Sequence, residues 1–155
     1  SVYTANAQTN TYGTTGLLSG ASVTSVVGSA TRTNVGTTAD NLSGVAGTGL
    51  SNYTISYSNA TLDIAKANAT VTANSNTTTY NGLSQSVSGF TATGLVNNET
   101  TSVLSGVTAN GSGTNAGTYT STASGTDSNY NLTFVNGTLT INPATVVVTT
   151  ISGTL

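Results

Sequence analysis

The feature that most constrains this chain is an internal repeat. Ser51–Ile64 (SNYTISYSNATLDI) aligns with Ser128–Ile141 (SNYNLTFVNGTLTI), and residues 145–150 match residues 68–73 at the same offset. Such self-similarity is typical of arrays in which each unit stacks on its neighbours. The sequence therefore divides into a shortened repeat 1 (1–66), repeat 2 (67–144) and the opening strand of a third repeat (145–155).

Repeat 1 is shorter than repeat 2 at one place. Tyr12-Gly13 corresponds to Tyr80-Asn81-Gly82, but about ten residues of repeat 2, from Leu83 to Thr93, are reduced to Thr14-Thr15 in repeat 1. Repeat 1 therefore lacks the strand that we expect at Val87–Phe90 in repeat 2.

Apolar and polar residues alternate near the end of each repeat. The apolar positions are Tyr53, Ile55, Tyr57, Leu62 and Ile64 in repeat 1, and Tyr130, Leu132, Phe134, Leu139 and Ile141 in repeat 2. This period of two predicts half-buried β-strands. Asn59-Ala60 and Asn136-Gly137 lie between the two runs, and Asn-Gly favours a two-residue turn. Each repeat is expected to end in a hairpin.

Composition also favours strands. Thr and Val are common, and 18 Gly with one Pro suit many tight turns. Asn97–Leu104 has a capping Asn and Glu99 in its first turn, which predicts one or two helical turns; Ser19–Val27 is its equivalent. Lys66-Ala67 and Pro143-Ala144 join the repeats without a flexible linker. We expect an all-β chain of small tandem antiparallel β-sandwich or β-grasp-like repeats that form an elongated rod, with one short helix per repeat at most.

Charge and residue types exclude several functions. The net charge is −2 and the only cations are Arg32 and Lys66, too few for binding nucleic acid. With no Cys and no His, the chain has no disulfide, no thiolate and no imidazole base or ligand. No apolar run approaches the ~20 residues of a membrane span, so no membrane insertion is expected. Any export signal is expected outside these residues.

The ionisable side chains do not form a recognisable site. Asp40, Asp63, Glu99 and Asp127 are scattered, whereas glycoside chemistry needs two carboxyl groups about 5–10 Å apart and Ca²⁺ needs six to eight oxygens. Lys66 could attack an Asn amide only in an apolar core, and its match to Pro143 favours a surface position. We predict no catalytic residues, no metal and no cofactor.

Tyrosine rings are core material or platforms for sugars. Tyr53, Tyr57 and Tyr130 lie in the alternating runs and are expected in the core, whereas Tyr12 and Tyr80 precede expected turns. If the chain binds glycans, the expected contacts are the loops at Tyr80–Gly82 and Asn110–Gly113. Nine Asn-x-Ser/Thr sequences, against about six expected by chance, are glycosylation candidates: Asn41, Asn52, Asn59, Asn68, Asn76, Asn98, Asn110, Asn131 and Asn136.

Few charges protect the sheet edges of this chain. Native sheets use Lys, Pro and inward charge to block edge pairing, so lateral self-association is expected. The C-terminal strand Val146–Val148 could instead complete the sheet of a neighbouring chain end to end.

Five segments of the sequence together resemble a known family. They are Tyr80–Gly82, Val87–Phe90, Gly94–Leu104, Asn115–Tyr119 and Asn129–Ile141. They are similar to the mostly-beta, glycine-rich (MBG-type) repeats in the stalks of large bacterial surface adhesins. Repeat 2 fits over nearly its full length, and repeat 1 fits at both ends.

The resemblance implies a non-enzymatic structural spacer in an exported adhesin fibre. The expected location is extracellular, at the cell surface or in the biofilm matrix, with neighbouring repeats of the same chain as partners. Two alternatives stay open: a glycan-binding adhesin module, and a self-assembling filament subunit completed by strand exchange.

Overall fold

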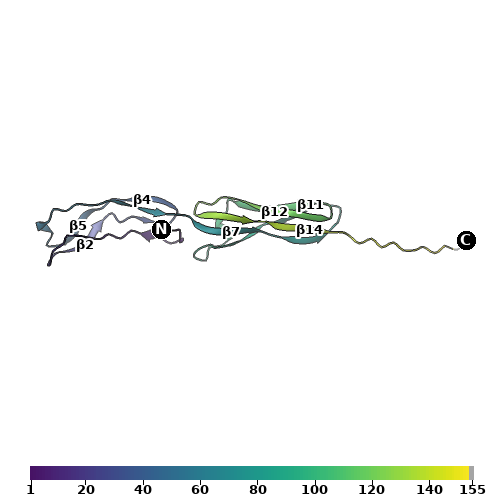
Figure 1. Cartoon of the computed structure of the whole chain (residues 1–155), viewed down its shortest axis with the longest axis horizontal. Coiled ribbons are helices and arrows are strands. Elements are labelled where there is room, and N and C mark those ends of the chain that lie inside the picture. The colour runs from purple at the N-terminus through teal and green to yellow at the C-terminus, as the bar shows by residue number, and fades with distance from the viewer. Residues whose placement is uncertain (154–155) are drawn as a thin grey trace. The chain divides into compact units, whose positions relative to one another are not determined.

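The computed structural model describes residues 1–153 and is built from strands (Figure 1). Its helical elements within these residues are two short 3-10 turns, Leu50–Asn52 and Thr101–Val103. The all-β class is therefore confirmed. The described chain forms two compact units: the first contains residues 1–68, 95–99 and 128–131, and the second contains residues 69–94, 100–127 and 132–153.

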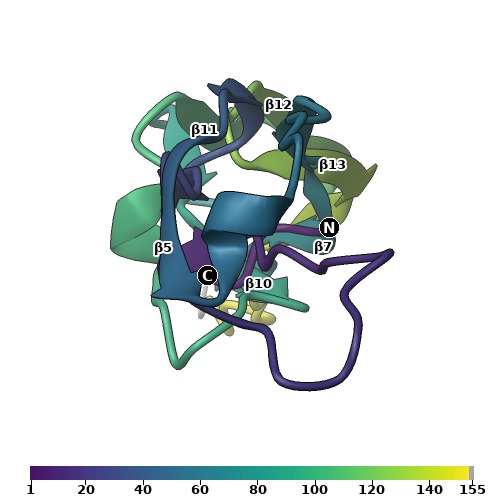
Figure 2. The same ribbon diagram turned by 90° about the vertical axis from the view of Figure 1, so that its left-hand side faces the viewer.

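Repeat 2 contains eight strands in two sheets. The strands are β7 (Ala67–Ala73), β8 (Asn76–Thr79), β9 (Gln85–Ser88), β10 (Phe90–Thr93), β11 (Val107–Gly113), β12 (Gly117–Gly125), β13 (Tyr130–Val135) and β14 (Gly137–Asn142). One sheet has the order β10-β7-β13 and the other has the order β8-β14-β12-β11-β9. In Figure 2, β11 and β12 are seen on one side and β7 and β10 on the other.

Side chains of these strands alternate between core and solvent, as the period of two predicts. β14 buries Leu139 and Ile141, which are 0% and 1% exposed, while Thr138 before them is exposed and Thr140 between them is half-buried. Both pack with Val87 of β9 and with the half-buried Tyr119 of β12. Strand β7 buries every second residue, including Val71. The apolar core of repeat 2 therefore forms where the alternation places it.

Repeat 1 has six strands in three two-stranded sheets. They are β1 (Gln8–Thr9), β2 (Ser22–Val27), β3 (Thr31–Arg32), β4 (Gly36–Asp40), β5 (Ser43–Thr48) and β6 (Ala60–Ile64), paired as β1-β3, β2-β5 and β4-β6. The β4–β6 register places Gly36 opposite Ile64, and the β12–β14 register places Gly117 opposite Ile141. Both repeats thus use the same pairing for their last strand.

The predicted terminal hairpins are wrong. β13 belongs to the three-stranded sheet and β14 to the five-stranded sheet, so the chain crosses from one sheet to the other at Asn136. Gly137 is buried and has no positive φ. A Cβ at this position would lie 2.4 Å from the Asn74 carbonyl oxygen. Glycine is needed for this close approach, not for a left-handed turn.

Three other local predictions need correction. The helix expected at Asn97–Leu104 is only the turn Thr101–Val103, because Asn97 and Asn98 have left-handed φ values of 51° and 57°. Its expected counterpart at Ser19–Val27 contains strand β2. The alternating run at Tyr53–Tyr57 is not paired as a strand, whereas its counterpart β13 in repeat 2 lies beside β7.

Residues 145–153 have no strand assignment, and the predicted strand extends to residues 154–155, which lie outside the described residues. Val146, Val147 and Val148 are 83%, 79% and 93% exposed. A strand here would need a partner outside residues 1–153, so the opening of a third repeat stays a prediction. Within the described residues, no helix has the length and apolar character needed to cross a membrane.

Candidate functional site

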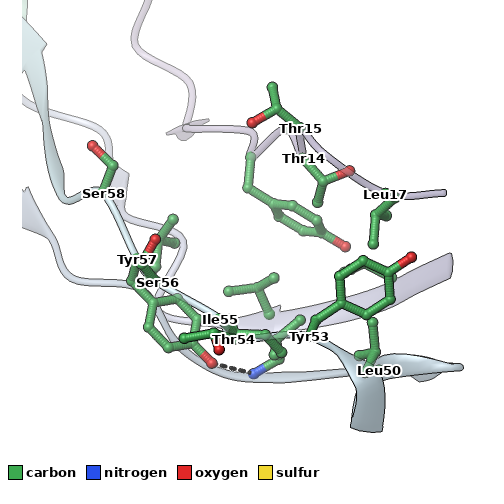
Figure 3. Close-up of a pocket in the computed structure, with 16 residues that line it drawn as sticks. Thr14, Thr15, Leu17, Leu50, Tyr53, Thr54, Ile55, Ser56, Tyr57 and Ser58 are labelled. Atoms are coloured by element: carbon green, nitrogen blue, oxygen red, sulfur yellow. Dashed lines mark hydrogen bonds between the residues drawn. The ribbon is translucent and has the colours of Figure 1, made fainter. Parts of the chain in front are cut away.

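Repeat 1 has an open groove with a volume of about 370 Å³. One side is the extended segment 53–58, and the other is formed by Thr14, Thr15 and Leu17 (Figure 3). Apolar side chains complete the lining, among them Val26 of β2 and Val45 of β5. The whole groove lies within the first compact unit.

The groove is open at the place where repeat 1 is shortened. In repeat 2, the segment after Tyr80 forms β9 and β10, and Val87 of β9 covers Leu139 and Ile141. Repeat 1 has only Thr14 and Thr15 in this stretch, and both line the groove. The absence of a covering strand therefore leaves the interior of repeat 1 accessible.

Two tyrosine hydroxyl groups are fixed at the groove by backbone amides. The Tyr53 hydroxyl accepts a hydrogen bond from the Leu18 N–H at 2.9 Å, and the Tyr57 hydroxyl accepts one from the Val45 N–H at 3.0 Å (Figure 3 shows the latter). A hydroxyl that accepts one bond can still donate its own proton. Tyr57 is 41% exposed and Tyr12 is 36% exposed, so both rings are accessible from solvent. The prediction of Tyr57 as core material is wrong.

No Asp, Glu, Lys or Arg lines the groove among the described residues. Asp63 lies on the exposed side of β6, where hydrogen bonds from Thr37 and then Thr61 hold the pKa of its carboxyl below the ordinary value. Arg32 is held by the turn that follows β3, where it donates to the carbonyl oxygens of Asn34 and Val35. The groove is therefore suited to an uncharged ligand.

Asp40 is the one carboxylate that is almost completely buried among the described residues. It is 4% exposed, and its Oδ2 accepts a hydrogen bond from the Asn10 side chain at 2.9 Å, while its Oδ1 has no partner. No group of three or more potential metal-ligating side chains occurs in the described part of the chain. Asp127 lies between β12 and β13, far along the sequence from Asp40.

Glu99 joins two buried tyrosines. Its carboxylate accepts hydrogen bonds from Tyr3 at 2.8 Å and from Tyr130, whose hydroxyl in turn accepts the Val96 N–H at 3.0 Å. The two rings meet edge to face with their centroids 5.5 Å apart. Burial, followed by the hydrogen bond to Glu99, raises the pKa of Tyr130 to about 12. The predicted core position of Tyr130 is confirmed; its partnership with Tyr3 and Glu99 has no local signal in the sequence.

The loops expected to contact glycans differ from one another. Tyr80 follows β8 and is 41% exposed, as a turn position should be. Asn110–Gly113 is not a loop, because it lies inside β11, where it pairs with β9 and where Asn110 also pairs with β12. Lys66 is half-buried between β6 and β7. Among the glycosylation candidates, Asn59 accepts a hydrogen bond from the Leu42 N–H through its side chain.

Comparison with known proteins identifies repeat 2. Residues 69–140 match the family model described as MBG domain (YGX type). The second repeat is therefore an MBG-type repeat, a non-catalytic kind of repeat domain associated with surface proteins. Neither the curated proteins nor the solved structures that were searched give a match.

Proposed function

We propose that this chain is a non-enzymatic spacer in an exported bacterial adhesin fibre, located at the cell surface or in the biofilm matrix. The observation that carries the proposal is how one repeat passes into the next. β6 ends at Ile64 and β7 begins at Ala67, so only Ala65 and Lys66 separate them. Two residues are too few to act as a flexible tether, since the reach of a linker grows with its length.

Neighbouring repeats of the same chain are the partners in this proposal. The first compact unit includes residues 95–99 and 128–131, which belong to repeat 2 by sequence. Asn129 accepts a hydrogen bond from the Val35 N–H at 3.0 Å, and Glu99 accepts one from Tyr3. A repeat of this size buries too little apolar surface for its own core to supply all of its stability. These hydrogen bonds add to that stability.

The residue inventory supports a structural role. Catalysis by nucleophile and base needs two such groups within hydrogen-bond reach, usually with His as the base. The chain has no His and no Cys. Glu99 is occupied by two tyrosine hydroxyls and Asp63 by two threonine hydroxyls.

Surface labelling tests this proposal on cells that make the natural protein. An antibody raised against the chain should label intact cells, and electron microscopy of the exported material should show a thin fibre with an axial repeat. Labelling that requires lysis, or globular particles without an axial repeat, would contradict the proposal. Measuring the extracted protein by immunoblot in both samples controls for expression.

The groove in repeat 1 favours a second candidate function, the binding of a neutral saccharide. Sugars bind through stacking on aromatic faces and hydrogen bonds to their hydroxyl groups, and the groove offers exposed tyrosine rings beside threonine and serine side chains. Its volume of about 370 Å³ is within the lower part of the range for small-molecule sites. The lack of charged side chains in the lining favours uncharged sugars.

A matched pair of tyrosine variants tests the saccharide candidate. Tyr12 and Tyr80 correspond in the repeats and are 36% and 41% exposed, but only Tyr12 lines the groove. Saturation-transfer NMR with a panel of neutral mono- and disaccharides should give a signal that is lost in Tyr12→Ala and kept in Tyr80→Ala. No signal in the parent chain, or equal loss in both variants, would exclude the groove as a saccharide site.

A further inference from the structure

The first and last parts of repeat 2 are joined by a parallel ladder. β8 pairs with β14 so that Asn76 lies opposite Leu139 and Thr79 lies opposite Asn142. The ladder extends one residue further, since the Tyr80 N–H donates to the Asn142 carbonyl at 2.8 Å. The pairs β7–β10, β9–β11, β11–β12 and β12–β14 of this repeat are antiparallel.

Strand direction decides how this ladder carries tension. The chain enters the ladder from the N-terminal side at Asn76 and leaves it toward the C-terminal side after Asn142. In a parallel pair these two points are at opposite ends of the ladder. Pulling the chain by its ends therefore slides β8 against β14, and every hydrogen bond between them is loaded at once. A pair loaded at one end would instead open one bond at a time.

The neighbouring strand β7 has the same geometry. Its first residue, Ala67, donates its N–H to the Asn129 carbonyl just before β13, and the Asn74 carbonyl after its end lies against Gly137, which follows β13. Strands β7 and β13 are adjacent in the three-stranded sheet. The start of β7 therefore lies beside the start of β13, and the end of β7 lies beside the end of β13. The two strands run in the same direction.

Side chains reinforce the ladder on both sides. Leu139 and Ile141 of β14 are buried in the core of repeat 2. On the outer edge of β8, the Gln85 side chain donates to the Thr79 carbonyl at 2.9 Å and accepts from the Thr78 hydroxyl. Sliding β8 along β14 must therefore break the ladder, the Gln85 bonds and the packing of the core together.

Repeat 1 has only a reduced form of this arrangement. Its N-terminal segment meets the end of β6 through a single parallel bridge, Val2 to Ala65, with bonds from the Tyr3 N–H to the Ala65 carbonyl and from the Ala65 N–H to the Ser1 carbonyl. Strand β1, which matches β8 in the repeat, pairs antiparallel with β3 instead. Repeat 1 also lacks the covering strand over its interior.

We propose that the β8–β14 ladder is a load-bearing clamp, and that repeat 1 is the part of this chain that yields first under tension. The inference deepens the proposed spacer function, because a surface fibre is where such tension arises. The clamp itself is a property of the chain and can be measured without reference to its location.

Single-molecule force spectroscopy on the whole chain, held by its two ends, tests the proposal. Unfolding repeat 1 from Ser1 to the end of β6 at Ile64 should release about 220 Å of chain, and unfolding repeat 2 from the start of β7 at Ala67 to the end of β14 at Asn142 about 260 Å, at ~3.4 Å per residue. We expect the shorter release at the lower force and the longer release at the higher force. The reverse order, or equal forces, would overturn the proposal.

Two proline variants of β8 separate the ladder from the rest of the repeat. Since the Tyr80 N–H points toward β14, the alternation of a strand places the Thr78 N–H on the same side and the Thr77 N–H on the outer side. Thr78→Pro removes a ladder bond and also the Thr78 hydroxyl that donates to Gln85, which Thr78→Val removes alone and so controls for. Thr77→Pro removes no ladder bond, because proline is tolerated where an edge N–H faces solvent. We expect the unfolding rate of repeat 2 at constant force to rise about tenfold in Thr78→Pro and by less than threefold in Thr77→Pro.

A change of pulling direction keeps the test decisive if Thr78→Pro fails to fold. The chain contains no Cys, so Asn115→Cys, in the turn between β11 and β12, gives a unique attachment point. When the chain is held at its N-terminus and at residue 115, no force is applied at the C-terminal end of β14, so β14 is not pulled along β8. The clamp requires a markedly lower unfolding force for repeat 2 in this direction, and an unchanged force would overturn it. This outcome is independent of the surface-labelling result, so the two proposals can fail separately.

Discussion

Exchanging residues between Gly137 and its counterpart Ala60 tests the strand crossover directly. A Cβ on Gly137 would lie 2.4 Å from the Asn74 carbonyl oxygen and 2.5 Å from the Ala73 carbonyl oxygen. Since both contacts are with backbone, β14 must move away from β7 by several tenths of an ångström. Overpacking of this kind costs about 1–3 kcal/mol, and the better strand preference of Ala over Gly offsets about 0.5–1 kcal/mol of it.

Gly137→Ala should therefore lower the free energy of unfolding of repeat 2 by about 1–2 kcal/mol. For a unit of this size, that corresponds to a fall in Tm of about 5–10 °C. Ala60 occupies the equivalent position in repeat 1, where the side chain is exposed and φ is not positive. Ala60→Gly should lower stability by about 0.5–1 kcal/mol, because glycine adds conformational freedom to the unfolded chain.

Hydrogen exchange of peptides from β6 and β14, combined with urea unfolding, measures the two effects separately in the full chain. If Asn136-Gly137 and Asn59-Ala60 were hairpin turns with positive φ, Ala60→Gly would stabilise repeat 1. Stabilisation by Ala60→Gly, or a Gly137→Ala variant as stable as the parent, would refute the crossover and the close approach on which it depends.

Three further predictions concern pH and the core. Because the pKa of Tyr130 is raised to about 12, the contribution of this residue to stability should be fully present below pH 10 and be lost as the pH rises from 10 toward 12; absorbance at 295 nm should show a late tyrosine titration that Tyr130→Phe removes. The pKa of Asp63 is lowered, so its contribution is present above the ordinary value and lost as the pH falls through the lowered one; NMR titration should show that Thr37→Val raises this pKa. Leu139→Ala should cost about 2–5 kcal/mol in urea unfolding, whereas Leu83→Ala, at a residue 68% exposed, should change stability by less than about 0.5 kcal/mol.

Alternation of apolar residues predicted the strands wherever a partner strand exists. Leu139 and Ile141 are buried on β14 as expected, and the equivalent Leu62 and Ile64 are buried on β6. The run at Tyr53–Tyr57 has the same alternation but no strand beside it, so its backbone forms no ladder. Periodicity shows which side chains can share a face; it does not show whether a neighbouring strand is present.

Local turn and loop signals were less reliable than alternation. Asn136-Gly137 was interpreted as a turn, and Asn110–Gly113 as a loop, from residue types alone. Both segments have small residues because another backbone comes close: a Cβ on Gly111 would lie 2.7 Å from the Thr120 carbonyl oxygen. The same residues that permit a turn also permit tight contact between strands, and only the three-dimensional neighbours distinguish the two.

The groove could have been inferred in part from the repeat alignment. The alignment showed that Thr14-Thr15 replaces a segment of about ten residues in repeat 2. The position of that segment over Leu139 and Ile141, and hence the opening left by its absence, depends on the sheet order. Likewise, the meeting of Tyr3, Glu99 and Tyr130 joins positions 96 and 31 residues apart and has no local signal.

Uncharged sheet edges led us to expect side-by-side association, and the strand order narrows where it would occur. The edges of the five-stranded sheet are β8 and β9, and Gln85 of β9 bonds to Thr78 and Thr79 of β8. The Gln85 side chain thus forms hydrogen bonds along the outer edge of β8. In many proteins an edge strand is instead protected by charged side chains. The edges of the three-stranded sheet are β10 and β13. If lateral association occurs, it should use β10 or β13: a Thr91→Lys change on β10 should reduce self-association in sedimentation experiments, whereas Thr77→Lys on β8 should not.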